Sequence, residues 1–382
     1  MQKELLISIL IHMQLAQTTV QCPKVAFFNY AVPVTIGTPP QKLMLAIDST
    51  ETYGCIQTAN CGSNCNINDT SIYDSTKSST YSRQSGNYPP RVILTDDSMQ
   101  GPVVSDNFQI GSTQLTGVTF KQVTPTYTRK QVSGVMGLGH SIEGSFKDFQ
   151  QAMSKPIYGF SVDSSTNFAN LDLGFYNKSL YQGELAFVKE IPMPISSLFN
   201  QTNVNSVVTP YALPISSFQV NGISIPNLNF TAFVHTDLSV SQFPSDIVAP
   251  IQSTFNLTLG TDGVYEAPCS LVKFLPTVVM TFNGFNATWT PQDYVYKYAS
   301  SDNCFLGFTE YKDPLFKDNL ILGMGMLSKY YLAFDHSNNQ IGFAQTIQPA
   351  APAQTGQLPS PTANSAFRNS VNLLLILFII LQ

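Results

Sequence analysis

An internal repeat divides the chain into two related halves. The segments VSGVMGLG and DNLILGMG share a run of apolar residues interrupted by glycines, and Gly137 and Gly323 occupy the same place in them. Asp48 lies 89 residues before the first of these glycines, and His235 lies 88 residues before the second. Because self-similarity at a fixed spacing indicates duplicated structural units, the sequence predicts two similar halves that meet near residues 190–210.

An apolar strand in each half ends on one ionisable residue. LMLAIDSTETYG places Asp48 after an apolar run, and FTAFVHTDLSVS places His235 at the same point of the second half. Apolar runs bounded by turn residues are typical of β-strands. A pseudo-twofold axis would bring the two residues together at the interface between the halves, and clefts between domains are common ligand sites. We therefore expect Asp48 and His235 to meet there.

The composition favours an all-β protein. A chain of 382 residues is too long for one small core and indicates two domains. The 24 prolines and 23 glycines, spread between short apolar runs, indicate many turns. Charged residues make up only 11% of the chain, and the net charge is −5 without a basic cluster. We therefore expect no nucleic acid as a partner.

The N-terminal end is typical of a secretory signal peptide. Lys3 precedes an apolar stretch, and small residues follow it. This order of regions predicts a signal peptide over residues 1–18, cleaved after Ala16 or Thr18. The alternative is a buried first strand or helix.

The C-terminal end has the organisation of a lipid-attachment signal. Residues 347–370 are rich in Pro, Ala and Ser, which is typical of a flexible stalk. Residues 371–382 close on an apolar run that is shorter than the roughly 20 residues of a membrane span. Small residues, a polar spacer and an apolar tail together predict a GPI-type signal. The alternative is a disordered tail with a chance apolar end.

Glycosylation sequons and cysteines also favour the secretory route. Six N-x-[ST] sequons predict glycosylation at Asn68, Asn177, Asn200, Asn229, Asn256 and Asn286. Six cysteines fit an oxidising compartment. The expected pairs are Cys61–Cys65, which closes a small loop, and Cys269–Cys304, which closes a 35-residue loop, while Cys22 and Cys55 remain as a candidate third pair. No second close pair of Cys or His accompanies CGSNC, which argues against a zinc site.

At these residues the chain resembles the pepsin-like aspartic peptidases. The segments IGTPPQ, YDSTKSSTYS, SGVMGLG, LPTVVMTFNG and LILGMGMLSKYYLAFDHSNNQIGFA follow one another at the family's spacing. The resemblance implies a bilobal all-β fold, with pseudo-twofold-related β lobes over 26–195 and 196–346. It also implies a cleft between the lobes that takes a peptide or protein, no cofactor, and a monomer.

The catalytic motifs depart from the family pattern. Each lobe of that family presents Asp-Thr-Gly, and the two carboxylates share one proton because adjacent anions repel. Here the motifs read DST from Asp48 and HTD from His235. Both keep a hydroxyl residue, but one acid and both glycines are replaced. The resemblance therefore implies a degenerate catalytic pair formed by Asp48 and His235.

Other family positions are altered as well. The hairpin that the family folds over its cleft carries a tyrosine, where LTDDSMQG places Leu94. Cys55 stands where the family usually has a tryptophan, and Met324 stands where it has Asp or Asn. These losses favour a function without catalysis.

Two functions fit this sequence. The first is a non-catalytic, secreted glycoprotein, held at the cell surface only through a lipid anchor, that binds a peptide or protein. The alternative is an atypical aspartic endopeptidase that uses Asp48 and His235. A carboxylate favours a charged imidazole, so we expect an ion pair between them near neutral pH. His140 and His336 are expected to be solvated loop residues.

Overall fold

The computed structural model describes most of the segment that resembles the aspartic peptidases. The described residues are 17–58, 72–84, 101–123, 132–139, 148–150, 153, 155–163, 165–191, 211–225, 230–298, 302–311, 319–347 and 355–356. The predictions that involve residues 1–16, Cys61, Cys65, Asn68, Leu94, His140, Asn200, Asn229 and residues 357–382 lie outside the described residues.

Short strands make up most of the structure, as the composition predicts. The first half contains β1 (Thr18–Ala26), β2 (Asn29–Ile36), β3 (Gln41–Asp48), β4 (Gly54–Gln57), β5 (Ser82–Arg83), β6 (Val103–Ile110), β7 (Thr113–Val123), β8 (Gly134–Gly137), β9 (Ile157–Asp163), β10 (Phe168–Leu173) and β11 (Ala186–Lys189). Its short 3-10 helices are η2 (Ser75–Lys77) and η3 (Lys178–Leu180).

The second half adds strands and three short α-helices. Its strands are β12 (Ala212–Val220), β13 (Ile223–Ser224), β14 (Thr231–Val234), β15 (Ser241–Pro244), β16 (Thr258–Leu259), β17 (Tyr265–Pro268), β18 (Val278–Phe282), β19 (Phe285–Trp289), β20 (Val295–Tyr298), β21 (Asn303–Leu306), β22 (Phe308–Tyr311), β23 (Asn319–Leu322), β24 (Tyr330–Asp335), β25 (Gln340–Gln345) and β26 (Thr355–Gly356). Its helices are α3 (Ser245–Phe255), α4 (Pro291–Tyr294), α5 (Met324–Leu327) and the 3-10 helix η4 (Cys269–Phe274). No helix in the described ranges is long and apolar enough to cross a membrane.

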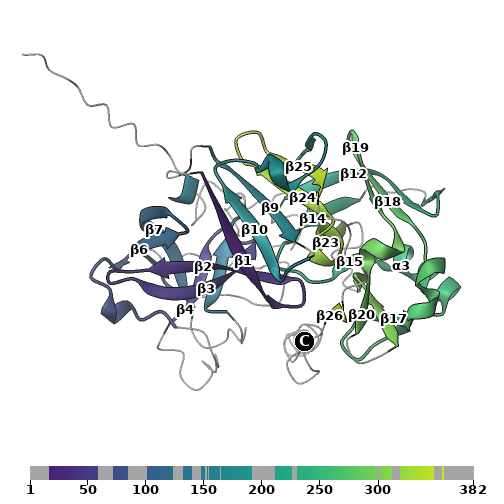
Figure 1. Ribbon diagram of the computed structural model, residues 1–382, viewed down its shortest axis with the longest axis horizontal. Helices are drawn as coiled ribbons and strands as arrows, with labels where there is room; N and C mark the ends of the chain where they lie inside the picture. The colour runs from purple at the N-terminus through teal and green to yellow at the C-terminus, as the bar shows by residue number, and fades with distance from the viewer. Residues whose placement is uncertain are drawn as a thin grey trace, which may run out of the picture.

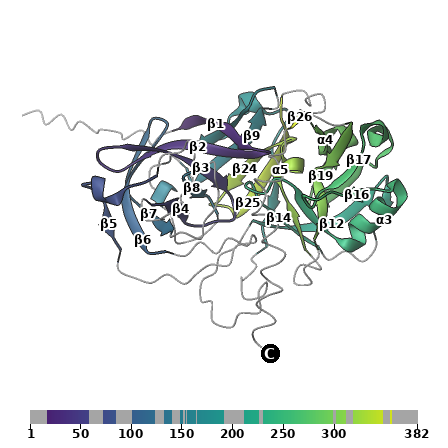
Figure 2. The ribbon, with the colours of Figure 1, turned by 90° about the horizontal axis from the view of Figure 1, so that it is seen from below.

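The strands form three sheets that place the two halves side by side (Figure 1). The largest has the order β11-β25-β24-β9-β10-β1-β2-β3-β8-β4-β7-β6-β5. The second runs β19-β18-β12-β14-β23-β15-β22, with β13 paired to β12, and the third runs β16-β17-β21-β20-β26. The view from below separates the early strands from the later ones (Figure 2). The fold is the bilobal all-β architecture that the sequence predicts.

The repeat appears as the same three-stranded unit in each half. Strand β3 runs parallel to β8, with Asp48 opposite Gly137, and β14 runs parallel to β23, with Val234 opposite Leu322. The next strand of each half, β4 or β15, then pairs antiparallel with the other side of β8 or β23. Each polar residue therefore leaves its strand beside a strand that ends at a repeat glycine, Gly137, or just before one, Gly323.

The glycines of the repeat allow backbones to approach closely. A Cβ atom on Gly137 would lie 2.6 Å from the Tyr53 carbonyl oxygen and 2.7 Å from that of Glu51. A Cβ on Gly323 would lie 2.6 Å from the Leu238 carbonyl oxygen. Real Cβ atoms do not approach carbonyl oxygens so closely, so only glycine fits these positions without a backbone shift.

The last strands complete the sheet of the first half. Strand β24 pairs with β9 through Leu332 opposite Phe160, and β25 pairs with both β24 and β11. The first strand, β1, begins at Thr18 and pairs with β10, upstream of residue 26, where the sequence places the start of the first lobe. One hydrophobic cluster extends through both halves. The two halves therefore share one core.

The cysteines give two different outcomes. Cys269 and Cys304 form the expected disulfide, with their Cα atoms 5.0 Å apart. The candidate pairing of Cys22 with Cys55 is wrong, because both are buried thiols that donate to the carbonyls of Val20 and Tyr53. Burial, with the nearby charge of Asp172, raises the pKa of the Cys22 thiol far above its usual value.

The described sequon residues differ in exposure, and their glycosylation stays a prediction. Asn256 and Asn286 are exposed, whereas Asn177 is half-buried and caps η3 by accepting hydrogen bonds from Ser179. The expectation of a solvated His336 is wrong. This side chain is buried beside Tyr158 and Tyr211, because the turn after β24 folds inward against them.

We predict that Gly137→Ala lowers the free energy of unfolding by about 3 kcal/mol, because the new methyl group overlaps two backbone carbonyls. The control is Gly117→Ala, at a turn with φ +66° and nothing within 4 Å of the added Cβ. It should cost about 1 kcal/mol for the left-handed backbone alone. Urea unfolding measures both variants, and equal losses would contradict the close approach.

Candidate active site

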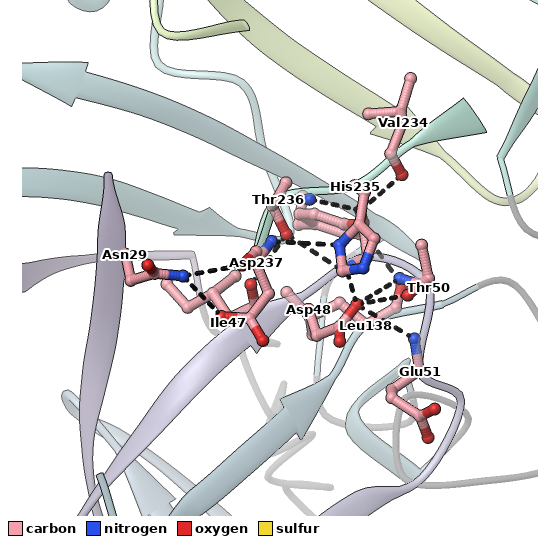
Figure 3. Close-up of polar contacts among 12 residues, drawn as sticks. Asn29, Ile47, Asp48, Thr50, Glu51, Leu138, Val234, His235, Thr236 and Asp237 are labelled. Atoms are coloured by element: carbon pink, nitrogen blue, oxygen red, sulfur yellow. Dashed lines mark hydrogen bonds and ion pairs between the residues drawn. The ribbon is translucent and has the colours of Figure 1, made fainter. Parts of the chain in front are cut away.

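Asp48 is a buried carboxylate at the end of β3, fixed by the loop that follows it. Its Oδ1 accepts hydrogen bonds from the Thr50 amide at 2.7 Å, the Thr50 hydroxyl at 2.7 Å and the Glu51 amide at 3.3 Å (Figure 3). Its carbonyl accepts from the Leu138 amide. Oδ2 has no hydrogen-bond partner among the described groups. One carboxylate oxygen is thus saturated with donors, and the other is left for a ligand or a proton.

His235 lies against Asp48 from the other half, as the repeat predicts. Its amide donates to the Leu322 carbonyl at the end of β23. Its Nδ1 lies 3.7 Å from Asp48 Oδ1, and both side chains are fully buried. This separation is too long for a hydrogen bond. Nδ1 also accepts the Asp237 amide at 3.3 Å (Figure 3).

The two hydroxyl residues of the motifs hold the loops together. The Ser49 hydroxyl donates to the Val234 carbonyl at 2.8 Å, and the Thr236 hydroxyl donates to the Ile47 carbonyl at 2.8 Å. Each oxygen also accepts the backbone amide of the other residue, at 3.0 and 3.1 Å. The four bonds are buried and follow the pseudo-twofold symmetry. They fix Asp48 and His235 side by side.

The residues that replace the family glycines are accommodated without strain. Among the described residues, the non-glycine residues with positive φ are Phe28, Asn221, Asn256 and Asn339. Thr50 and Asp237 are not in this set, so neither position demands glycine for its backbone conformation. Thr50 instead gives Asp48 two donors. Asp237 accepts two hydrogen bonds from the side-chain amide of Asn29, one through its backbone carbonyl at 2.7 Å and one through Oδ1 at 2.9 Å.

A buried aromatic group supports Asp48 from behind and was not identified from the sequence. The Leu138 carbonyl accepts hydrogen bonds from the Tyr158 and Tyr211 hydroxyls at 3.3 and 3.2 Å. The Tyr211 hydroxyl also lies 2.5 Å from Nε2 of His336. Burial raises the pKa of both tyrosines well above the usual value, so they stay neutral donors. The sequence indicates only that His336 follows an apolar strand.

The site holds an acid and an imidazole where two acids would share a proton. No group of three or more His, Cys, Asp or Glu side chains in the described residues is arranged to hold a metal ion. The arrangement provides one carboxylate oxygen, one imidazole and a rigid loop pair joined by hydroxyl groups. Two β lobes with this symmetric loop pair at their junction define the class of bilobal aspartic peptidase folds.

Comparison with known proteins gives the family directly. Residues 29–346 match the family model of eukaryotic aspartyl proteases, and the chain belongs to this family. It is 26% identical to the vacuolar aspartic protease of Candida albicans, over 83% of this chain and 75% of that protein. It is 25% identical to the chymosin of Camelus dromedarius and 26% identical to the pepsin A of Canis lupus familiaris, with 84% and 83% of this chain and 81% of each relative covered.

We predict that Ser49→Ala lowers the free energy of unfolding by about 2–4 kcal/mol, because it leaves the Val234 carbonyl and the Thr236 amide buried without partners. Thr236→Ala should cost a similar amount. The double variant should cost less than the sum, because the two side chains share the same bonds. Urea unfolding measures all three. Ser49→Thr, which keeps the hydroxyl, is the matched control, and additive losses would contradict the coupling.

Proposed function

We propose that the protein is a catalytically silent member of the aspartyl protease family that binds a peptide or protein between its two lobes. The observation that carries this proposal is the contact at His235. Peptide hydrolysis by this family needs two carboxylates that share one proton across the interface. Here the imidazole of His235 stands in place of the second carboxylate. Its Nδ1 accepts a hydrogen bond from the Asp237 amide and lies 3.7 Å from Asp48 Oδ1. This geometry does not support proton sharing.

Thr50 adds a second argument for silence. Its amide and hydroxyl both donate to Asp48 Oδ1 at 2.7 Å. A general base works best when its lone pairs face the proton that it removes. Occupation of one oxygen by three donors leaves a single oxygen for that task. Misplacement of a reacting group can reduce the rate by about 100-fold, and here one of the two reacting groups has been replaced by an imidazole.

The alternative function is an atypical endopeptidase, and one observation favours it. The hydroxyl groups of Ser49 and Thr236 form a complete set of four bonds, so Asp48 is held rigidly beside a titratable partner. Oδ2 of Asp48 is buried and has no hydrogen-bond partner among the described groups, so one carboxylate oxygen is left without a donor. In this mechanism Asp48 removes a proton from water while a protonated His235 donates to the peptide carbonyl.

The proposed location is the outside of the cell. The signal peptide predicted at residues 1–18 and the exposed sequon residues Asn256 and Asn286 support secretion and glycosylation. The buried disulfide partner Cys304 supports an oxidising compartment. The apolar end over residues 371–382 supports attachment through a GPI anchor. The protein is proposed to act as a monomer.

We predict that the secreted protein does not cleave a quenched-fluorescent peptide library between about pH 3 and 7.5, because the pair cannot share a proton. The rate should equal that of the Asp48→Ala variant within error. A calibrating variant carries Thr50→Gly, His235→Asp and Asp237→Gly together, and it should cleave at acid pH. Circular dichroism should confirm that all three proteins are folded.

A rate at least tenfold above the Asp48→Ala variant would overturn the silent assignment and establish the endopeptidase. A library of the same peptide sequences, displayed on phage, tests whether the protein binds peptides. Peptides that bind the wild-type protein without being cleaved support the proposal. A library that yields neither cleavage nor bound peptides contradicts peptide binding.

We predict that a phosphatidylinositol-specific phospholipase releases the protein from the surface of cells that express the full chain, because the anchor is proposed to be a GPI lipid. Immunoblotting of the medium measures the release. A variant that lacks residues 371–382 is the control and should appear in the medium without the enzyme. Retention of the full chain after enzyme treatment would refute the anchor.

A further inference from the structure

We propose that Asn29 and Asp237 form a latch between the two lobes that holds His235 as a neutral positioning residue, with its proton on Nε2. The latch consists of the side chain of Asn29, the residues Asp237 and Ser239, and the turn at Phe27 and Phe28. The inference deepens the proposed function and rests on it in one respect. A working Asp48–His235 pair would require the protonated imidazole that the latch opposes.

The polar part of the latch uses every hydrogen-bonding group of the Asn29 amide. Nδ2 donates to the carbonyl of Asp237 at 2.7 Å and to its Oδ1 at 2.9 Å. Oδ1 of Asn29 accepts from the Ser239 hydroxyl at 2.7 Å. The Ser239 hydroxyl also lies 2.5 Å from the Phe27 carbonyl oxygen, so its single hydrogen is shared between that carbonyl and Asn29. Asn29 begins β2 of the first lobe, and Asp237 and Ser239 belong to the loop after β14 of the second. Figure 3 shows Asn29 beside Asp237. Polar contacts of Phe27 and Asn29 therefore join the two lobes at this loop.

The apolar part of the latch anchors Asn29 in place. The preceding residues, Phe27 and Phe28, are buried at the turn between β1 and β2. The Phe27 ring lies 4.8 Å from that of Phe305, and the Phe28 ring lies 4.6 Å from that of Tyr296, both edge to face. Aromatic pairs of this edge-to-face geometry stabilise a contact beyond the burial of their surface. The turn of the first lobe is thus fastened to the second lobe.

The backbone at this turn is strained. Phe28 has φ +56°, a left-handed conformation that is unfavourable for a bulky residue. Such conformations persist only where surrounding contacts over-determine them, and they gather at functional sites. The rings of Tyr296 and Phe305 provide those contacts. The packing that holds Phe28 in this conformation also fixes the backbone of the next residue, Asn29.

The latch determines which nitrogen of His235 carries the proton. Asn29 holds the loop at Asp237 through the carbonyl and the carboxylate of that residue. In this loop conformation the backbone amide of Asp237 donates to Nδ1 of His235 at 3.3 Å. An N–H group can donate only to a nitrogen that has a lone pair, so Nδ1 must be unprotonated. The neutral imidazole then carries its hydrogen on Nε2. This assignment replaces the ion pair expected from the sequence with a neutral imidazole beside Asp48.

The test measures the tautomer of His235 by nuclear magnetic resonance of the full protein labelled with ¹⁵N-histidine at neutral pH. The His235 signals are identified by their loss in His235→Gln. In the wild type we expect Nδ1 to have the shift of an unprotonated nitrogen, with the Nε2–H tautomer favoured by about fivefold to tenfold, as one hydrogen bond allows. A proton on Nδ1 overturns the proposal.

Variants of the latch separate positioning from structural support. Asn29→Asp removes both donated bonds and places a second carboxylate against Asp237, so the preference for the Nε2–H tautomer should fall toward that of a free histidine side chain. Asn29→Ala serves the same purpose if that variant does not fold. Asp237→Asn keeps the amide, the carbonyl and one side-chain oxygen, and it should keep the preference.

The matched control is Asn283→Asp at an exposed turn, which should leave the tautomer unchanged. A tautomer that does not respond to Asn29 would overturn the latch. Peptide cleavage by the wild type would instead overturn the silent function, so the two failures are distinguishable.

Discussion

The reciprocal contact between Ser49 and Thr236 is the interaction on which the rest of the site depends. Each hydroxyl satisfies a carbonyl and an amide of the opposite loop, in a region with no access to water. Because buried backbone groups without partners are costly, both loops are bound to this arrangement. Asp48 and His235 are neighbours as a consequence of these bonds, and their own interaction contributes little to holding the loops together. The framework therefore keeps its geometry whether or not the residues inside it can react.

The sequence determines the part of the structure that depends on local patterns. The spacing of Asp48 and Gly137, and of His235 and Gly323, predicts the paired strands because the repeat records a backbone arrangement. Strand type follows from short apolar runs between turn residues. The disulfide between Cys269 and Cys304 could be predicted because few other cysteines were available to pair with these two.

The remaining features depend on contacts between distant segments, which leave no local signal. Nothing near Asn29 indicates that its amide meets Asp237, which lies in the other lobe. His336 follows an apolar strand, a position usually solvated, but the neighbouring Tyr211 hydroxyl gives it a buried partner. Cys22 lies in β1, and its thiol donates a hydrogen bond to the Val20 carbonyl of the same strand. Tertiary context overrides local preference at each of these positions.

The place of β24 and β25 in the largest sheet has a consequence for how the chain is made. The first lobe contributes β1 to β11 to that sheet, but β25 and β24 lie between β11 and β9 in the strand order. The partner edges of β9 and β11 stay open until residues 330–345 have left the ribosome. At 5–20 residues per second, the roughly 150 residues between β11 and β25 take on the order of ten seconds. During synthesis the early lobe is therefore an unfinished sheet with exposed edges, and such edges can pair with other chains.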